Sequence, residues 1–134
     1  MATNKMSTVS IGRFGEDAAE AFLKSRGWTI IERNFRVEHL EVDIIATRND
    51  VFAFIEVKSR KLVDNNVYGA PINAVNLKKR KNIVRAAELY LLMNQIDESL
   101  QINLDIIEVY IVSESGELRV SKIRHFLNAY TADT

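Results

Sequence analysis

Four charged side chains interrupt two apolar segments of the chain: Glu41, Asp43, Glu56 and Lys58. Side chains alternate between the two faces of a strand, so Glu41 and Asp43 share one face of their segment, and Glu56 and Lys58 share one face of theirs. The intervening Arg48–Asp50 is rich in residues that favour turns. The sequence therefore predicts a β-hairpin on which carboxylates and a lysine converge.

This set of residues suits the hydrolysis of a phosphodiester. The carboxylates of Asp43 and Glu56 are the hard oxygen ligands that Mg²⁺ or Mn²⁺ prefers. A metal held there would acidify a bound water and neutralise charge on a phosphate, while Lys58 would orient the water or stabilise the transition state. The alternative is a solvated sheet face with an ordinary Glu–Lys pair. The apolar surroundings favour the functional interpretation, because charges in a buried strand need partners or a metal.

Other ionisable residues have weaker claims to this site. Glu16, on a predicted helix, could supply a further carboxylate, although a solvated helix glutamate is the simpler interpretation. Asp105 interrupts a later strand and either faces the site or bonds to backbone. His39 and His125 are isolated, and no spacing of His, Cys and carboxylates indicates zinc, so both are interpreted as surface or core histidines.

Basic residues gather downstream of the hairpin. Residues 55–85 contain eight Lys or Arg and two Asp or Glu, a net charge of +6 in a chain whose formal net charge is zero. Cations at a helix N-terminus oppose the helix dipole, which favours a functional reason for those at the start of the helix predicted over 77–93. The alternative is a solvated helix end. The residues predicted to contact a nucleic-acid backbone are Arg60, Lys78, Lys79, Arg80 and Lys81.

The elements that position these residues follow from periodicity and turn signals. We expect a flexible N-terminus over 1–10 and one domain over 11–130. Helices are predicted over 11–26 and 77–93, with a closing helical turn over 126–130. Strands are predicted over 28–35, 41–47, 51–60, 101–112 and 118–123, and an irregular loop over 61–75. The order α-β-β-β-α-β-β predicts an α/β fold with a mixed sheet and helices packed on it.

The composition excludes several classes of protein. The 134 residues are 47% hydrophobic and 27% charged, as in ordinary soluble domains, and include no cysteine, which excludes disulfides and thiolate chemistry. Because no apolar run approaches membrane-spanning length and the first ten residues lack the apolar stretch of a signal peptide, we expect a cytoplasmic protein without a membrane partner.

Six short motifs in order resemble the YraN family, which is largely uncharacterised and is grouped with the restriction-endonuclease-like (PD-(D/E)XK) nucleases, including archaeal Holliday-junction resolvases. The resemblance spans about Gly12 to Tyr130. Its motifs are Gly12–Glu16, Glu32–Arg36, Glu41–Ala46, Phe54–Arg60, Gly69–Pro71 and Asn128–Tyr130.

The resemblance implies a restriction-endonuclease-like mixed β-sheet flanked by helices. Asp43 and Glu56 would be the metal ligands and Lys58 the catalytic lysine of the Asp…Glu-X-Lys signature. Glu16 matches a helix glutamate that assists in resolvase-like members, and Glu41 matches the glutamate two positions before the family's aspartate. Leu40 stands where the family usually has glycine, so the entry to this strand is expected to differ.

Three functional hypotheses remain open from the sequence. The first is a Mg²⁺- or Mn²⁺-dependent endonuclease or resolvase-like enzyme that acts on nucleic acid, in the first instance DNA. The second is a nucleic-acid-binding module that keeps the fold without turnover, which predicts salt-sensitive binding without cleavage. The third is a protein-interaction subunit, for instance a homodimer, which the zero net charge favours over strong DNA binding.

Overall fold

The computed structural model describes residues 8–63, 66–68, 77–97 and 99–132 of the chain. Within these ranges, two helices and six strands follow in the order predicted, apart from a short extra strand, β4, which lies in the predicted loop over 61–75. Their bounds are α1 (Thr8–Ser25), β1 (Thr29–Val37), β2 (Leu40–Arg48), β3 (Val51–Val63), β4 (Asn66–Tyr68), α2 (Leu77–Met93), β5 (Gln101–Glu114) and β6 (Glu117–Tyr130). The order confirms the α/β prediction of a mixed sheet with flanking helices.

Helix α1 begins three residues before the predicted start and ends at Ser25, two residues before a glycine. Gly27 follows with a φ of 89°, a left-handed conformation that glycine adopts without strain. The Gly27 and Trp28 amides donate to the Lys24 and Leu23 carbonyls, which closes the last turn. None of the helices in the described ranges is long and apolar enough to cross a bilayer.

The strands form one mixed sheet in the order β1-β2-β3-β5-β6, with β4 paired to the outer end of β3. β1, β2 and β3 are a meander, and the turn at Asn49, with a φ of 55°, joins β2 to β3 as predicted. β5 returns through α2 to lie parallel to β3, and β6 pairs antiparallel with β5. This crossover places β3, with Glu56 and Lys58, at the centre of the sheet.

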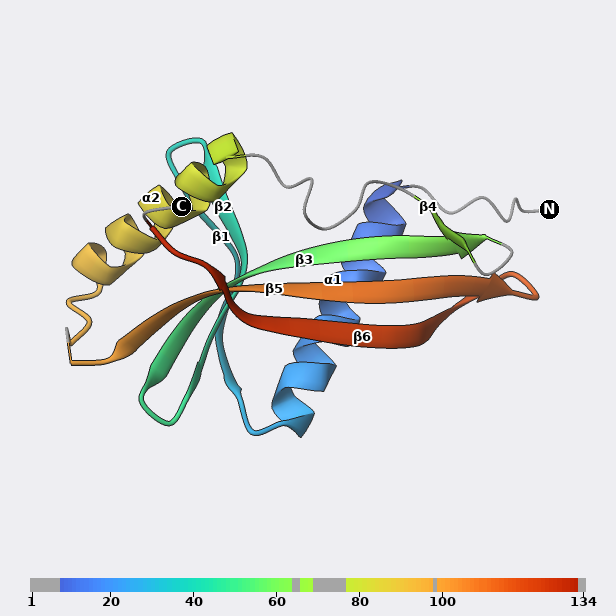
Figure 1. Ribbon diagram of the computed structural model, residues 1–134, viewed down its shortest axis with the longest axis horizontal. Coiled ribbons are helices and arrows are strands. Elements are labelled where there is room, and N and C mark those ends of the chain that lie inside the picture. The colour runs from blue at the N-terminus through green and yellow to red at the C-terminus, as the bar shows by residue number, and fades with distance from the viewer. Residues whose placement is uncertain (1–7, 64–65, 69–76, 98, 133–134) are drawn as a thin grey trace.

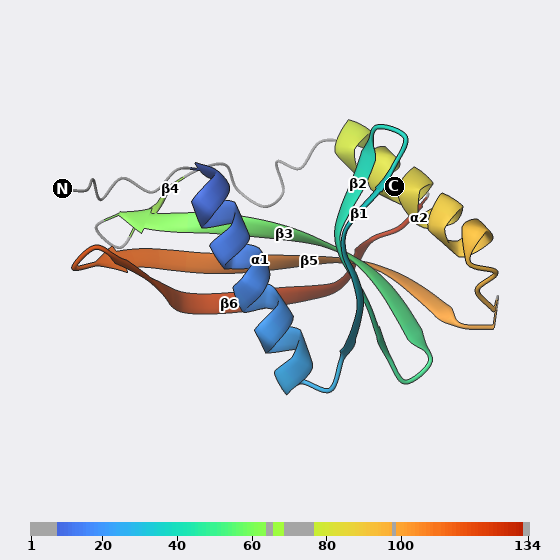
Figure 2. The same ribbon diagram turned by 180° about the vertical axis from the view of Figure 1, so that it is seen from behind.

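Each helix covers a different part of the sheet (Figure 1). Ala19 and Leu23 of α1 pack on one face against Ile44, Ile55 and other aliphatic residues. On the opposite face, α2 packs Ile83, Ala86 and Tyr90 over an aromatic cluster that includes Phe54. Figure 2 shows α1 in front of β3, β5 and β6, while α2 lies at one end, beside the β1–β2 hairpin. A stretch of the α2-side face of β3, β5 and β6 therefore has no described helix over it.

Strands β2 and β3 stop pairing partway along their length. Their register runs from Arg48↔Val51 to Ile44↔Ile55, whereas β1 continues to pair with β2 as far as Leu40. Beyond Ile44 the β1–β2 hairpin swings toward α2 while β3 continues along β5 (Figure 1). The next residues on the two strands are Asp43 and Glu56, so the opening falls between the two predicted metal ligands.

The C-terminal prediction was wrong. Residues 126–130, expected to form a helical turn, belong to β6, which pairs with β5 as far as Leu104↔Tyr130. The register shifts between Leu104 and Ile106, and Asn128 has a φ of 49° at this bulge. The Asn128 amide donates to Asp105 Oδ1 at 2.7 Å and its side chain accepts from the Leu104 amide. Pairing with β5 thus overrides the local preference.

Candidate active site

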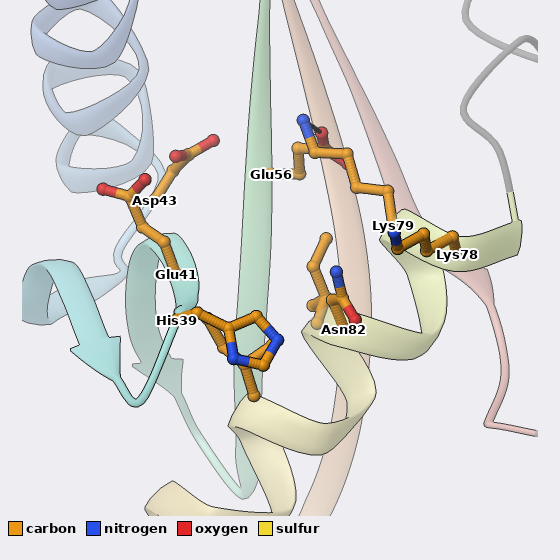
Figure 3. A pocket seen from close by; sticks show the side chains of 9 residues that line it. His39, Glu41, Asp43, Glu56, Lys78, Lys79 and Asn82 are labelled. Carbon is orange, nitrogen blue, oxygen red and sulfur yellow. Dashed lines mark ion pairs between the residues drawn. The ribbon is translucent and has the colours of Figure 1, made fainter.

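A cavity of about 350 Å³ opens where β2 leaves β3, beneath the first turns of α2. Figure 3 shows Asp43 and Glu41 on the β2 side, Glu56 on β3, and Lys79 reaching from α2 toward Glu56. The polar residues that line the cavity are His39, Glu41, Asp43, Glu56, Lys78, Lys79 and Asn82. The structure therefore brings both predicted metal ligands to one opening.

Asp43 is held in place by the neighbouring strand. Its Oδ2 accepts a hydrogen bond from the Val57 amide at 2.8 Å, which takes the place of a backbone pairing between the diverging strands. Burial raises the pKa of Asp43 to about 6, and the charges of Glu16 and Glu56 act in the same direction, against the Val57 hydrogen bond and Lys79. A carboxyl group with its pKa raised in this way titrates near neutral pH, as functional acids often do.

Glu56 is a buried carboxylate between two ammonium groups. Only 3% of the residue is exposed, and its Oε2 lies 2.9 Å from Lys58 Nζ and 2.5 Å from Lys79 Nζ. Lys58 follows it on the same face of β3, whereas Lys79 comes from α2, and half of its side chain is exposed. The two lysines provide the partners that a buried charge requires.

The two lysines differ in their proton affinity. Burial lowers the pKa of Lys58, and the nearby charge of Lys79 lowers it further, although Glu56 opposes both. Burial also acts to lower the pKa of Lys79, but Glu56 outweighs it, so the pKa of Lys79 is raised. Lys58 is consequently the group that gives up a proton more readily, while Lys79 stays a cation.

The donor set suits a hard divalent cation in a limited way. Asp43 and Glu56 offer carboxylate oxygens, and Glu56 Oε1 makes no hydrogen bond to the described residues. Within those same residues, no group of three or more His, Cys, Asp or Glu converges to hold a metal. One or two carboxylates with waters and substrate oxygens are nevertheless a usual Mg²⁺ environment.

The two additional predicted glutamates lie at the edge of the site. Glu16 on α1 lies 3.3 Å from Arg33 of β1 and is close enough to Asp43 to affect its titration. Glu41 lines the cavity but lies 3.3 Å from the exposed Arg36. Each therefore has an arginine partner outside the Asp43–Glu56 opening.

The predicted nucleic-acid contacts divide into three groups. Lys78 and Lys79 line the cavity and Lys81 is exposed nearby on α2. The Arg80 guanidinium lies 5.2 Å over the Tyr130 ring. Arg60 lies apart: it is 7% exposed, and its Nε donates to Glu108 Oε2 at 3.4 Å. Its burial argues against the backbone contact predicted for it, because the adjacent acid on β5 holds it in the sheet.

Sequence reasoning missed two polar residues of the cavity. His39 follows Glu38, whose φ is 58° in the β1–β2 turn, and Asn82 lies one helical turn after Lys78 on α2. The i, i+4 spacing of Lys78 and Asn82 places both on one helix face and could have indicated Asn82. His39 has no comparable signal, because its position depends on the swing of the hairpin.

Asp105 and His125 lie away from the cavity. Asp105 has no exposed surface, and its Oδ2 is 2.8 Å from His125 Nε2. His125 packs against Phe22 and Trp28 on the α1 side of the sheet. The pair belongs to the core, in agreement with the interpretation of His125 as a core histidine.

Comparison with known proteins identifies relatives along nearly the whole chain. Residues 15–109 match the model of the uncharacterised protein family UPF0102. A UPF0102 protein of Acetivibrio thermocellus is 39% identical over 95% of this chain and 95% of its own length. A UPF0102 protein of Clostridioides difficile is 38% identical over 93% of this chain and its own full length, and one of Prosthecochloris aestuarii is 36% identical over 92% and 94%.

Proposed function

The chain belongs to the uncharacterised protein family UPF0102, the YraN family that its motifs resemble, and we propose a function for it from the geometry of the candidate active site. The proposed function is that of a metal-dependent nuclease that hydrolyses phosphodiesters of DNA. The proposal includes a restriction-endonuclease-like fold. The spacing Asp43…Glu56-Val57-Lys58 on two adjacent strands of a mixed sheet supports it.

One observation carries the proposal: Asp43 and Glu56 line the same cavity at the point where their strands part, with two lysines on Glu56. A solvated sheet face would not need a 3%-exposed carboxylate or a carboxyl group whose pKa burial raises to about 6. A buried ion pair of this kind is weak evidence for stability, because apolar residues of similar volume often stabilise a fold as well or better, and a functional reason for Glu56 is therefore favoured.

Asp43 and Glu56 would hold Mg²⁺ or Mn²⁺, which supplies an acidified water and a counter-charge for the phosphate when bound. Lys58, the more acidic of the two lysines, would orient that water and donate a hydrogen bond that stabilises the negative charge on the reacting phosphate. Lys79 stays charged at the open side of the cavity and would bind a non-reacting phosphate oxygen.

A cleavage assay tests the proposal. Purified protein is incubated with end-labelled single-stranded, duplex, nicked and four-way-junction DNA, with Mg²⁺, Mn²⁺ or EDTA. We expect metal-dependent cleavage that falls about 100-fold or more in Asp43→Asn, Glu56→Gln and Lys58→Met. Lys24→Met, which removes an exposed lysine on α1, is the matched control and should cleave like the wild type.

The outcomes separate the alternatives. Cleavage that persists in Asp43→Asn and Glu56→Gln would come from a contaminating enzyme and would reject the assignment. Salt-sensitive DNA binding without cleavage by any folded protein would support the non-catalytic binding module. No binding, together with a stable dimer in light scattering, would support the interaction subunit.

A further inference from the structure

Three rows of side chains cross the sheet beyond α2, on the face that carries Glu56. The rows follow from the register, because residues directly paired across β3, β5 and β6 share a face. They are Glu56–Ile106–Phe126, Lys58–Glu108–Arg124 and Arg60–Tyr110–Lys122. The candidate active site therefore continues, without a change of face, onto a surface formed by β5 and β6.

The acids on this surface are already neutralised from β3. Glu56 pairs with Lys58, and Glu108 pairs with Arg60 and accepts a hydrogen bond from the Tyr110 hydroxyl at 2.8 Å. Both acids are 3% exposed. The surface accessible to solvent is consequently dominated by the cations of β6.

Lys122 and Arg124 are exposed and are held by aromatic rings. Lys122 Nζ lies 4.6 Å from the centre of the Tyr110 ring, and the Arg124 guanidinium lies 5.5 Å from that of Phe126. Among the described residues, neither forms an ion pair with a carboxylate. A cation held by a ring keeps its full charge, and its position is fixed without a competing anion.

We propose that Lys122 and Arg124 bind the phosphodiester backbone of a polynucleotide that extends from the Asp43–Glu56 cavity across the open face of β5 and β6. The identity of the partner rests on the proposed function, and charge complementarity and continuity with the cavity support the location. β6 lies about 10 Å from β3, two strand spacings, so one nucleic-acid strand could contact both. In Figure 1 this face is turned to the viewer and α1 lies behind it.

The surface is built to contact phosphates rather than bases. Tyr110 is 7% exposed and lies under Lys122, so its ring is not available for base stacking. Phosphate contacts position a nucleic acid without reading its sequence. We therefore expect binding through these residues to be independent of sequence and sensitive to salt.

Fluorescence anisotropy with DNA in EDTA tests this surface independently of cleavage. Lys122→Gln/Arg124→Gln should weaken binding roughly tenfold or more at low salt, and lower the slope of log K against log salt by about 1 for each cation removed. The matched control is Lys24→Gln/Arg26→Gln, in the last turn of α1 and just after it, which also removes two exposed cations, one of them a guanidinium 4.5 Å from the Phe22 ring. The control should bind like the wild type.

Two further arms keep the result interpretable. Lys122→Arg/Arg124→Lys conserves the charge and should retain binding, which excludes a loss caused by misfolding. Comparing a single strand with a duplex of equal length identifies which form of the backbone the surface binds. Equal losses in the β6 and α1 double variants, or an unchanged affinity in the β6 variant, would overturn the proposal. DNA binding that depends on Lys122 and Arg124, in a protein that does not cleave DNA, would reject the nuclease function and leave this binding surface in place.

Discussion

The Asp43 carboxylate accepts the Val57 amide hydrogen bond at the point where β2 and β3 stop pairing. One residue of β2 thus does two things: it completes the hydrogen bonding of β3 and lines the cavity. This relationship ties the geometry of the candidate active site to the stability of the sheet, and it makes Asp43 accessible to measurements that need no substrate.

Asp43 should make the protein less stable as the pH rises from about 4 to 6. The pKa of this group is raised to about 6 in the folded chain, above its ordinary value of 3.8, so the folded state keeps a proton that the unfolded state has lost. Asp43→Asn removes this titration and keeps an acceptor for Val57. The free energy of unfolding of the Asp43→Asn variant should exceed that of the wild type by up to about 3 kcal/mol above pH 6, and this difference should decline toward pH 4. Urea denaturation across this range measures it.

The control for that experiment is Asp97→Asn. The Ser99 amide and hydroxyl lower the pKa of Asp97, so this acid stabilises the fold at neutral pH and loses that contribution as pH falls. Its variant should therefore be less stable than the wild type at neutral pH. A difference for Asp43→Asn that does not vary with pH would contradict the raised pKa.

Lys79→Met should increase the affinity of the protein for Mn²⁺. Lys79 Nζ forms an ion pair with Glu56 Oε2, so it competes with a metal for that oxygen. Because half of the lysine side chain is exposed, we expect a moderate effect, about tenfold, in calorimetry or Mn²⁺ electron paramagnetic resonance. Lys78 lines the same cavity, so Lys78→Met is the control. If the two variants bind Mn²⁺ equally, Lys79 does not compete with the metal for Glu56 Oε2.

Gly15→Ala should destabilise the contact between α1 and β3 by about 1–3 kcal/mol. A Cβ at Gly15 would overlap Ser59 Oγ and lie 3.1 Å from Ser59 Cβ. Gly12→Ala, three residues earlier on the same helix, meets nothing within 4 Å and should stabilise the helix by about 0.5–1 kcal/mol. Urea denaturation compares the two. Adding Ser59→Ala to Gly15→Ala should recover part of the loss, and a failure to do so would place the strain elsewhere.

Arg60→Met should reduce stability rather than DNA affinity. Among the described residues, it would leave the buried Glu108 with the Tyr110 hydroxyl as its remaining partner, at a cost of about 3 kcal/mol. Arg60→Met/Glu108→Gln keeps an acceptor for Tyr110 and should regain much of that loss. DNA binding, measured where the variant is folded, should match the wild type. Weaker binding would show that Arg60 does reach the backbone.

The order of elements and the hairpin that carries the acids could be predicted from the sequence, because they depend on local patterns. Charges inside an apolar run identify Glu56 and Lys58, and the turn at Asn49 sets the register of β3 with β2, which ends one residue before Glu56. The helix over Leu77–Met93 was predicted with its observed bounds.

The remainder depends on tertiary contacts that no local pattern contains. Lys79 meets Glu56 because α2 crosses the end of the sheet, and Lys122 and Arg124 reach the Glu56 face only through the register of β6 with β5. Residues 126–130 belong to β6 because they pair with β5 and because Asp105 accepts the Asn128 amide. The predictions for Gly69–Pro71 and most of the loop over 61–75 lie outside the described residues.

The parting of β2 from β3 has a consequence for how the molecule can be observed. The amide proton of Val57 is retained by a side chain instead of a neighbouring backbone carbonyl, so its exchange with solvent deuterium should follow the ionisation and position of one aspartate. The nuclear magnetic resonance signal of this single nitrogen-labelled amide therefore reports whether the Asp43 side chain still bridges the two diverging strands.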